Sequence, residues 1–453
     1  MTITFCGGAQ SVTGSKHLVT LDDGPRVLLD CGMFQGQEAN HYDQHDNFLR
    51  GIDPATIDYL MLSHAHVDHS GLVPLLVKSG FTGPIFCTPP TRELCELVLN
   101  DSAHLQQYEA DPLYTAADVE RCWNQFVTVP YGQAHRVSEA VEVLFTDAGH
   151  VLGSAAVNLT LRENQRTRTL CFSGDVGRYS NRILNAPQAC PPAEVVICES
   201  TYGDHFHASL ENTEERLRRI IQDTCVERQG KLLIPAFSIG RTQELILSLA
   251  YLAEHDRLPP VNIFVDSPMS VYATDIIRNH TECFNPDLSD YLGAEGDPFT
   301  FPQLHYITEV EDSKLLHAVD EPCVIISSSG MMQGGRIVHH LHHNIGDARN
   351  TVLITGYCEP STLGGRLMQG AQRVGIRGEE HAVEAEIIQM KEYSAHADYG
   401  DFLRFLFPQQ SDVLRQLFLV HGETSRMESF KTSLEADGYR NVTVAAPRIS
   451  YEV

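Results

Sequence analysis

A dense group of metal-binding side chains lies early in the chain. Residues 64–69 hold three histidines and one aspartate, namely His64, His66, Asp68 and His69. Imidazole nitrogens and carboxylate oxygens are ligands that Zn²⁺ binds in proteins. In an extended or turn conformation, His64 and His66 can point the same way while Asp68 and His69 fall on a second side. The spacing therefore predicts ligands for two adjacent ions; a histidine-rich loop without metal is the alternative.

The elements around this group must hold it in place. The apolar run 59–62 predicts a buried strand, and residues 70–77 predict the start of a helix. A strand-to-helix turn allows backbone and side chains to converge on one point.

Other predicted strands end in the same way. Apolar strands within 26–32, 141–146 and 169–177 lead to Asp30, His150 and Asp175, each followed closely by glycine, which permits a sharp turn. Together with the strand before His64, these ends predict strands that converge on one metal centre. We expect Asp30 to orient a ligand histidine rather than to bind metal. The strand 195–199 ends in another carboxylate, Glu199.

Length and composition indicate a soluble protein with more than one domain. Its 453 residues suffice for two or three units with cores of their own. We find no apolar run of about 18 residues, which a membrane span needs, and no signal-peptide pattern at the N-terminus. Twelve cysteines without any Cys-x-x-Cys pair indicate reduced thiols. We therefore predict a cytoplasmic protein without a membrane partner.

The net charge restricts the partners of the protein. A surface with a formal charge of −26 repels polyanions on average. Any nucleic-acid site therefore needs a locally positive cleft, supplied by metal ions and a few arginines. Tight non-specific binding of nucleic acid is disfavoured.

The order of the predicted elements indicates an inserted domain. Residues 1–204 are rich in strands with metal-capable ends. Over 205–383, strands alternate with helices, which predicts a doubly wound parallel α/β domain. Single functional residues, His396 and His421, return within 384–453 after predicted strands. The chain is thus predicted to leave its first domain near residue 205 and to re-enter it near residue 384.

Taken in order, these residues resemble known families. Asp30, His64-x-His66-x-Asp68-His69, His150 and Asp175 resemble the metallo-β-lactamase fold of metal-dependent hydrolases. Three later motifs, Glu199-Ser-Thr-Tyr-Gly, Ser-Ala-His396-Ala-Asp and Val-His421-Gly-Glu, resemble motifs A, B and C of the β-CASP nucleases. The resemblance spans nearly the whole chain and is to stand-alone prokaryotic relatives of the pre-mRNA 3′-end endonuclease. It implies an αββα sandwich with an inserted β-CASP domain.

The resemblance also implies a ligand set and a mechanism. Two zinc ions per chain, with manganese as the alternative metal, would be bridged by Asp175. The first would be held by His64, His66, His150 and Asp175, and the second by Asp68, His69, Asp175 and His421. A hydroxide shared by the ions, next to the catalytic ligand Asp68, would attack the phosphodiester. His396, oriented by Glu199, would protonate the leaving oxygen, so that a 5′-phosphate and a 3′-hydroxyl result.

The same resemblance implies the substrate. RNA-directed members carry histidine at motif C, where DNA-directed members usually carry valine, so His421 favours RNA. We expect the substrate to be single-stranded RNA that is cleaved endonucleolytically. A homodimer is compatible with it. Phosphate contacts are expected from polar, glycine-rich segments and arginines of the insertion, although turns and ion pairs within the domain are the alternative roles. These candidates are Arg241, Ser328, Ser329, Gly330, Arg336 and Arg366.

Other interpretations remain open at this point. The protein could be a 5′–3′ exoribonuclease, a hydrolase of small esters or thioesters, or a non-enzymatic RNA-binding scaffold. The histidine-rich run 339–343 looks metal-like, but it lies on a predicted helix. We expect that helix to be at the surface or in an interface.

Overall fold

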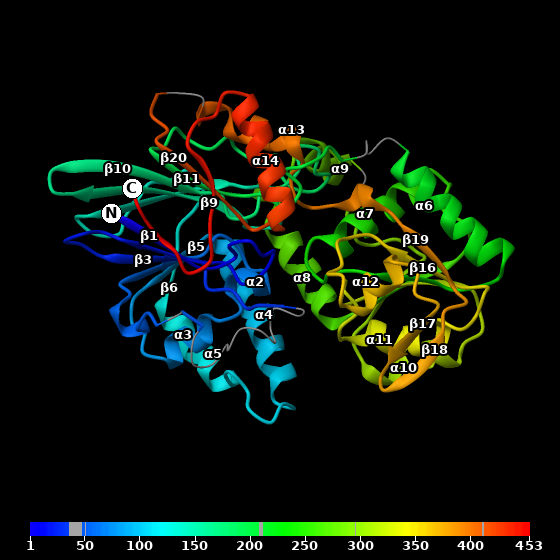
Figure 1. The fold of residues 1–453 in the computed structure, drawn as a ribbon. Helices are drawn as coiled ribbons and strands as arrows, with labels where there is room; N and C mark the ends of the chain where they lie inside the picture. The colour runs from blue at the N-terminus through cyan, green and yellow to red at the C-terminus, as the bar shows by residue number, and fades with distance from the viewer. Residues whose placement is uncertain (36–47, 50, 208–211, 295, 410–411) are drawn as a thin grey trace. The chain divides into compact units, whose positions relative to one another are not determined.

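The computed structural model describes residues 1–35, 48–49, 51–207, 212–294, 296–409 and 412–453. The chain forms two compact units, drawn in Figure 1. The first comprises Met1–Phe206 and His396–Val453, and the second comprises His207–Ala395. All twelve cysteines are buried, and none of them forms a disulfide. Among the described residues, no helix combines the length and apolar character needed to cross a membrane.

Two seven-stranded sheets make up the centre of the first unit. One sheet has the order β22-β1-β2-β3-β4-β5-β6, and the other has the order β21-β20-β11-β10-β9-β8-β7. The strands of the first sheet are β1 (Thr2–Gly7), β2 (Lys16–Thr20), β3 (Arg26–Leu29), β4 (Tyr59–Met61), β5 (Ile85–Cys87), β6 (Phe126–Thr128) and β22 (Ser450–Glu452). Those of the second are β7 (His135–Arg136), β8 (Val141–Asp147), β9 (Ala155–Glu163), β10 (Arg166–Phe172), β11 (Val195–Glu199), β20 (Gln416–Val420) and β21 (Val442–Val444).

The apolar core lies between these sheets. Phe5, Leu29, Phe145 and Phe172 are buried in one cluster with side chains from both sheets. Since side chains alternate along a strand, every second residue of each strand points into this layer. The strand β11 shows the alternation clearly, because Val195 and Ile197 join this cluster, whereas Val196 and Cys198 belong to a second one.

Helices cover the outer faces of the sandwich. The second cluster joins β11 and β20 to side chains of α13 (Tyr399–Leu406) and α14 (Thr424–Ala436). Figure 1 shows α3 and α5 on the other side, beside β5 and β6. The helices of that side are α2 (Val67–Ser70), α3 (Val73–Lys78), α4 (Pro89–Gln106) and α5 (Ala116–Cys122). This αββα arrangement confirms the predicted fold class of the first unit.

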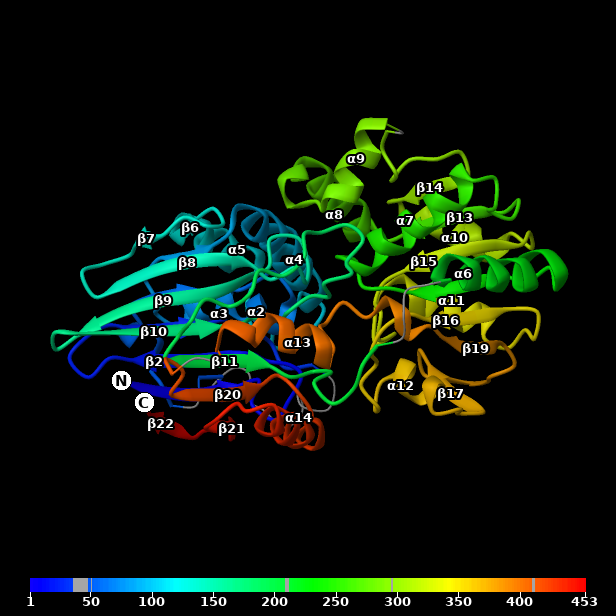
Figure 2. The same ribbon diagram turned by 90° about the horizontal axis from the view of Figure 1, so that it is seen from above.

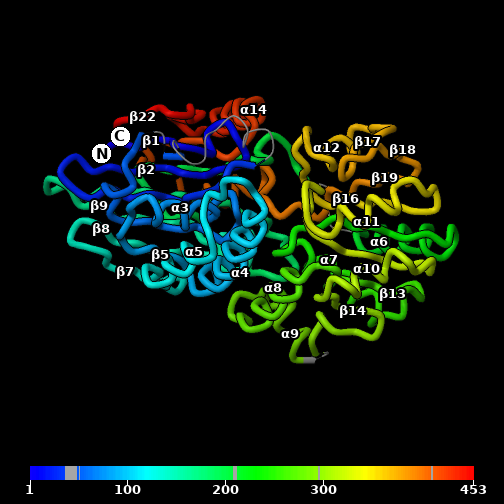
Figure 3. The backbone as a smooth tube through the Cα atoms, turned by 90° about the horizontal axis from the view of Figure 1, so that it is seen from below, coloured from blue at the N-terminus to red at the C-terminus, as the bar shows by residue number. Residues whose placement is uncertain are grey.

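The two segments of the first unit are joined by strand pairing. β20, which follows the second unit in sequence, pairs in parallel with β11, so that Val420 lies beside Glu199. β22 pairs with β1, and the two chain ends therefore lie together, as Figure 3 shows. This pairing places the residue after β20, His421, at the same sheet edge as the end of β11.

The second unit is built on a six-stranded sheet with the order β14-β13-β15-β12-β16-β19 (Figure 2). All its strand pairs are parallel. The strands are β12 (Leu232–Pro235), β13 (Asn262–Asp266), β14 (Leu304–Ile307), β15 (Cys323–Ser327), β16 (Thr351–Ile354) and β19 (Glu386–Gln389). The helices are α6 (Thr213–Ile221), α7 (Arg241–Glu254), α8 (Pro268–Asn279), α9 (Pro286–Ala294), α10 (Val310–Ala318), α11 (Arg336–Asn344) and α12 (Leu363–Met368).

Both faces of this sheet are covered. Leu233, Ile325 and Val352 are buried in one cluster with residues of α11 and α12, while their neighbours Ile234 and Ile326, on the opposite face, are buried as well. Parallel sheets covered on both faces carry such continuous apolar runs. The inserted doubly wound domain is thus confirmed as a fold class. A hairpin of β17 (Arg373–Ile376) and β18 (Glu379–Ala382) lies against the α11 and α12 side of the cluster.

The second domain boundary differs from the expected one. The sequence predicts re-entry into the first domain near residue 384, whereas β19 pairs with β16 and forms an edge strand of the second sheet. The first unit resumes only at His396. β19 is a short strand that is followed closely by His396. In sequence it therefore resembles the strands of the first unit that end near a histidine or a carboxylate.

Candidate metal centre

The candidate ligands gather at one edge of the sandwich because each follows the end of a strand. His64 and His66 lie in the loop after β4, and Asp68 and His69 lie in the short helix α2. The remaining ligands come from the second sheet: His150 follows β8, Asp175 follows β10 and His421 follows β20. All of them belong to the first unit.

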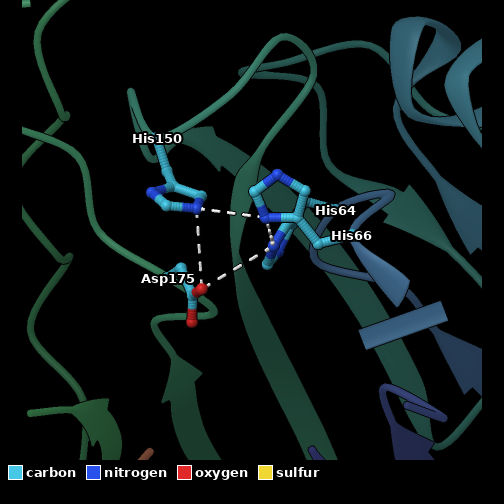
Figure 4. Close-up of side chains that lie close together, drawn as sticks. All are labelled: His64, His66, His150 and Asp175. Carbon is cyan, nitrogen blue, oxygen red and sulfur yellow. Dashed lines mark hydrogen bonds and ion pairs between the residues drawn. The ribbon is translucent and has the colours of Figure 1, made fainter. Parts of the chain in front are cut away.

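The first ligand group has distances that suit a tetrahedral ion (Figure 4). His66 Nδ1 lies 3.1 Å from His64 Nε2 and 3.3 Å from His150 Nε2. Asp175 Oδ2 lies 3.7 Å from His64 Nε2 and 3.6 Å from His150 Nε2. A zinc ion with ligands at 2.0–2.1 Å holds them about 3.3 Å apart. Three imidazoles and a carboxylate at these separations fit one such ion.

The second ligand group adjoins the first through Asp175. Its members Asp68, His69 and His421 have ligand atoms within 4.8 Å of one another. His421 Nε2 lies 3.4 Å from His69 Nε2 and 3.6 Å from Asp68 Oδ2. Asp175 Oδ1 lies 3.3 Å from His69 Nε2, so its two oxygens face different groups. That oxygen is buried without a hydrogen-bond partner among the described residues, a deficit that a bound cation would remove.

Burial and mutual charge set the protonation of these ligands. Burial and the neighbouring His69 keep the pKa of His64 well below its usual value. The pKa of His150 is also far lowered, by burial and by His396, and burial lowers the pKa of His66 to about 4. These imidazoles are therefore neutral near pH 7, so each has a ring nitrogen with a lone pair that can bind a metal ion. Burial raises the pKa of Asp175, but His421 and His69 outweigh this and hold it well below its usual value.

Asp30, which follows β3, contacts the ring of His69. The His69 Nδ1–H donates to Asp30 Oδ2 at 2.6 Å, which turns Nε2 towards Asp175. Asp30 also accepts bonds from the Ser63 backbone N–H and hydroxyl, each at 2.7 Å. Burial lowers the pKa of His69, but the charges of Asp175 and Asp30 outweigh it and hold that pKa well above its usual value.

Three positioning residues were missed by the sequence analysis. Ser63 holds Asp30, as described, and Thr201 Oγ1 lies 3.2 Å from His421 Nδ1. Lys16 is fully buried and donates to the carbonyl oxygens of Gly14 and Gly32 at 2.9 and 2.6 Å. Ser63 and Thr201 lie next to singled-out residues, whereas no sequence signal marks Lys16 as a support for these loops.

The candidate proton donor lies beside the first ligand group. His396 Nδ1 lies 3.1 Å from Glu199 Oε1 and 3.8 Å from Asp175 Oδ2. Burial lowers the pKa of His396, but Glu199, Asp175 and Asp68 outweigh it and raise it to about 9. Asp175, Glu199, His396 and His421 also form a third group whose spacing could hold a metal. The geometry thus allows His396 to be either a proton donor or a ligand.

The candidate phosphate contacts all lie in the second unit. Arg241 is buried and donates to Thr355 O at 2.8 Å. Arg336 Nη1 is ion-paired with the buried carboxylate of Asp266 at 2.7 Å. These two arginines therefore have partners within their own domain, which is the alternative role named above, whereas Arg366 is exposed on α12.

The serine and glycine candidates lie together after β15. Ser328 Oγ lies 3.0 Å from Ser267 Oγ. Ser329 Oγ donates to Gly334 O at 3.2 Å, so it helps to close this loop. A Cβ at Gly330 would come within 2.8 Å of the Phe237 ring, which gives that glycine a packing role.

The fold and the ligand groups define a metal-dependent hydrolase of the metallo-β-lactamase type. Residues 18–193 match the metallo-beta-lactamase superfamily domain, residues 242–367 match the Beta-Casp domain, and residues 380–447 match the Zn-dependent metallo-hydrolase RNA specificity domain. The chain belongs to the β-CASP family of this superfamily.

Individual relatives support this assignment. Ribonuclease TTHA0252 of Thermus thermophilus is 36% identical, over 94% of each chain. Transcription termination factor FttA of Methanocaldococcus jannaschii is 30% identical, over 94% of this chain and 68% of its own. A solved structure of a protein of unknown function from Enterococcus faecalis V583 shares the fold, with a TM-score of 0.56 at 12% identity over 99% of both chains.

Proposed function

We propose that the chain is a metal-dependent ribonuclease. It hydrolyses phosphodiester bonds within single-stranded RNA and leaves 5′-phosphate and 3′-hydroxyl ends. The observation that carries this proposal is Asp175, whose two oxygens face two separate ligand groups beside the His396–Glu199 pair. Two neighbouring cations and a nearby general acid can together catalyse phosphodiester hydrolysis.

The two ligand groups support a proposal of two metal sites. His64, His66, His150 and Asp175 would hold one ion, and Asp68, His69, Asp175 and His421 would hold the other; zinc is proposed for both, with manganese as the alternative. When bound, such a pair neutralises phosphate charge and lowers the pKa of water. Asp30 and Ser63 keep the His69 ring directed at this site.

The proton for the leaving 3′-oxygen comes from His396. Glu199 is fully buried and accepts bonds from the Val176 and Thr201 backbone N–H groups at 2.8 and 3.1 Å. A carboxylate fixed in this way orients the imidazole and keeps a proton on it. The His396 side chain keeps 22% of its surface exposed, so substrate can reach the ring.

RNA as the substrate is supported by the C-terminal part of the chain. Residues 380–447 match the Zn-dependent metallo-hydrolase RNA specificity domain, and they include both His396 and His421. Relatives named ribonuclease and transcription termination factor agree with a role in RNA metabolism. On the second unit, Arg366 is the arginine that we propose for phosphate contact, since it is exposed.

Cleavage of end-labelled RNA tests this proposal. Single-stranded RNA labelled at its 5′ or 3′ end is incubated with purified protein, with and without chelator. We expect internal fragments with 5′-phosphates, loss of cleavage with chelator, and its return with Zn²⁺ or Mn²⁺. Stepwise release of nucleotides from the 5′ end would indicate an exonuclease, and chelator-insensitive cutting would contradict the proposal. Light scattering on the same protein measures whether it is a monomer or a homodimer.

A further inference from the structure

A separate group of metal-capable side chains lies within the second unit. His342 of α11 and Glu379 and His381 of β18 offer ligand atoms that lie within 4.8 Å of one another. His342 Nε2 lies 3.9 Å from Glu379 Oε2. The His342 and His381 rings meet edge to face, with centroids 4.7 Å apart. None of these residues belongs to the candidate metal centre, which is built from the first unit.

The hairpin presents two of these residues to the helix. His381 lies opposite Val374 and Glu379 lies opposite Ile376 in the antiparallel β17–β18 pair. Residues directly opposite each other share a face, and Val374 and Ile376 are buried in the cluster that contains Leu341 of α11. Glu379 and His381 are therefore on the hairpin face that looks towards α11, where His342 follows Leu341.

The polar atoms at this contact are poorly satisfied. His342 Nδ1 and His381 Nε2 are buried without a hydrogen-bond partner among the described residues. Since buried polar atoms in proteins almost always have a partner, a bound ion or water is expected next to these nitrogens. Two other histidines of α11 are already engaged, since His340 Nε2 lies 2.6 Å from Asp266 Oδ2 and His339 Nδ1 lies 2.7 Å from Arg377 Nη1. At the hairpin face, by contrast, two imidazoles from separate elements lie next to one carboxylate.

We propose that His342, Glu379 and His381 bind a divalent cation of the zinc type and thereby tie the β17–β18 hairpin to α11. Two imidazoles and one carboxylate form a ligand set for such ions, with a fourth position left for water. The present separations exceed the about 3.3 Å of a tetrahedral zinc site. The Glu379 side chain is 71% exposed, so it can rotate to close that gap.

Metal content measures this site directly. Wild-type protein, His381→Gln and Glu379→Gln are dialysed against the same buffered Zn²⁺ solution, and zinc per chain is measured by plasma mass spectrometry. The matched control is His343→Gln, an exposed histidine of the same helix outside the ligand group. We expect both variants to hold one zinc fewer than the wild type and the control. This difference does not depend on how the candidate metal centre is loaded. Equal zinc content in all four proteins would overturn the proposal.

Thermal unfolding supplies a second readout. A ligand that binds only the folded state raises Tm, and the rise grows with the ratio of the ligand concentration to its Kd. We expect added Zn²⁺ to raise Tm less in Glu379→Gln than in His343→Gln, with equal Tm values for both in chelator. If His381→Gln does not fold, the exposed position Glu379 carries the test. If added Zn²⁺ raised Tm equally in Glu379→Gln and in the wild type, the proposal that a cation links the β17–β18 hairpin to α11 would be contradicted.

Discussion

Glu199 connects His396 to the backbone next to Asp175. Its Oε1 lies 3.1 Å from His396 Nδ1 and accepts the Val176 N–H at 2.8 Å. One fully buried carboxylate thus fixes both the candidate acid and the residue that follows the candidate bridging ligand. This arrangement couples the orientation of the His396 ring to the position of the metal ligands.

The role of His396 as an acid can be separated from a role as a ligand. We expect His396→Ala to lower kcat on RNA by about 10²–10⁴-fold, because an alkoxide leaving group needs a proton. An aryl phosphodiester with a p-nitrophenolate leaving group does not need one, so its turnover should fall far less. Glu199→Gln should show the same pattern with a smaller loss.

Kinetics with the two substrates, together with zinc content, check this prediction. The acid role requires that His396→Ala keeps the zinc content of the wild type. An equal loss on both substrates, accompanied by loss of zinc, would instead make His396 a ligand.

Asp30 should raise the affinity for the metal although it is not itself a ligand. Asp30→Asn removes the carboxylate that accepts the His69 Nδ1–H, and loss of such a partner typically weakens metal binding about 10–100-fold. Competition with a chromogenic chelator measures the change. The control is Asp58→Asn, because Asp58 is exposed and accepts a bond from the Arg26 N–H. Unchanged affinity in Asp30→Asn would refute the positioning role.

Gly32 should not tolerate a side chain. A Cβ at this position would lie 1.6 Å from Asp68 O and 2.7 Å from His69 N, both backbone atoms beside the centre. Overpacking of this kind costs about 1–3 kcal/mol and moves the backbone. We therefore expect Gly32→Ala to lower both Tm and zinc affinity. Gly375→Ala, whose Cβ would meet nothing within 4 Å, is the control and should leave zinc affinity unchanged.

Asp147 should make stability depend on pH. Burial raises its pKa from 3.8 to about 7 in the folded protein. The folded state therefore binds the proton more tightly, and this stabilisation is lost as pH rises from about 4 through 7, up to about 4 kcal/mol. Asp147→Asn can still accept the Gly149 N–H that now bonds Asp147 at 2.8 Å.

The variant should gain stability relative to wild type at higher pH. Thermal unfolding of both proteins in chelator, at pH 5 and at pH 8, measures this gain as a difference in Tm. A constant difference between the two proteins across this range would contradict the prediction.

The sequence predicts the ligands of the candidate metal centre better than it predicts the long-range contacts around them. Strand ends that lead to His64, His150 and Asp175 were visible because apolar runs stop at polar residues. The contact of His421 with Asp68 and His69 depends on β20 pairing with β11, a long-range contact that only the resemblance implied. The partners of Arg336 could not be predicted, since its ion pair with Asp266 joins residues from separate strands and helices.

The most direct test of the account is a crystal structure of the zinc-loaded protein with anomalous data at the zinc absorption edge. We predict two peaks on either side of Asp175. One should lie among His64, His66 and His150, and the other among Asp68, His69 and His421. A single peak in this region, or two peaks that do not share Asp175, would contradict the two-cation centre on which the proposed ribonuclease activity depends.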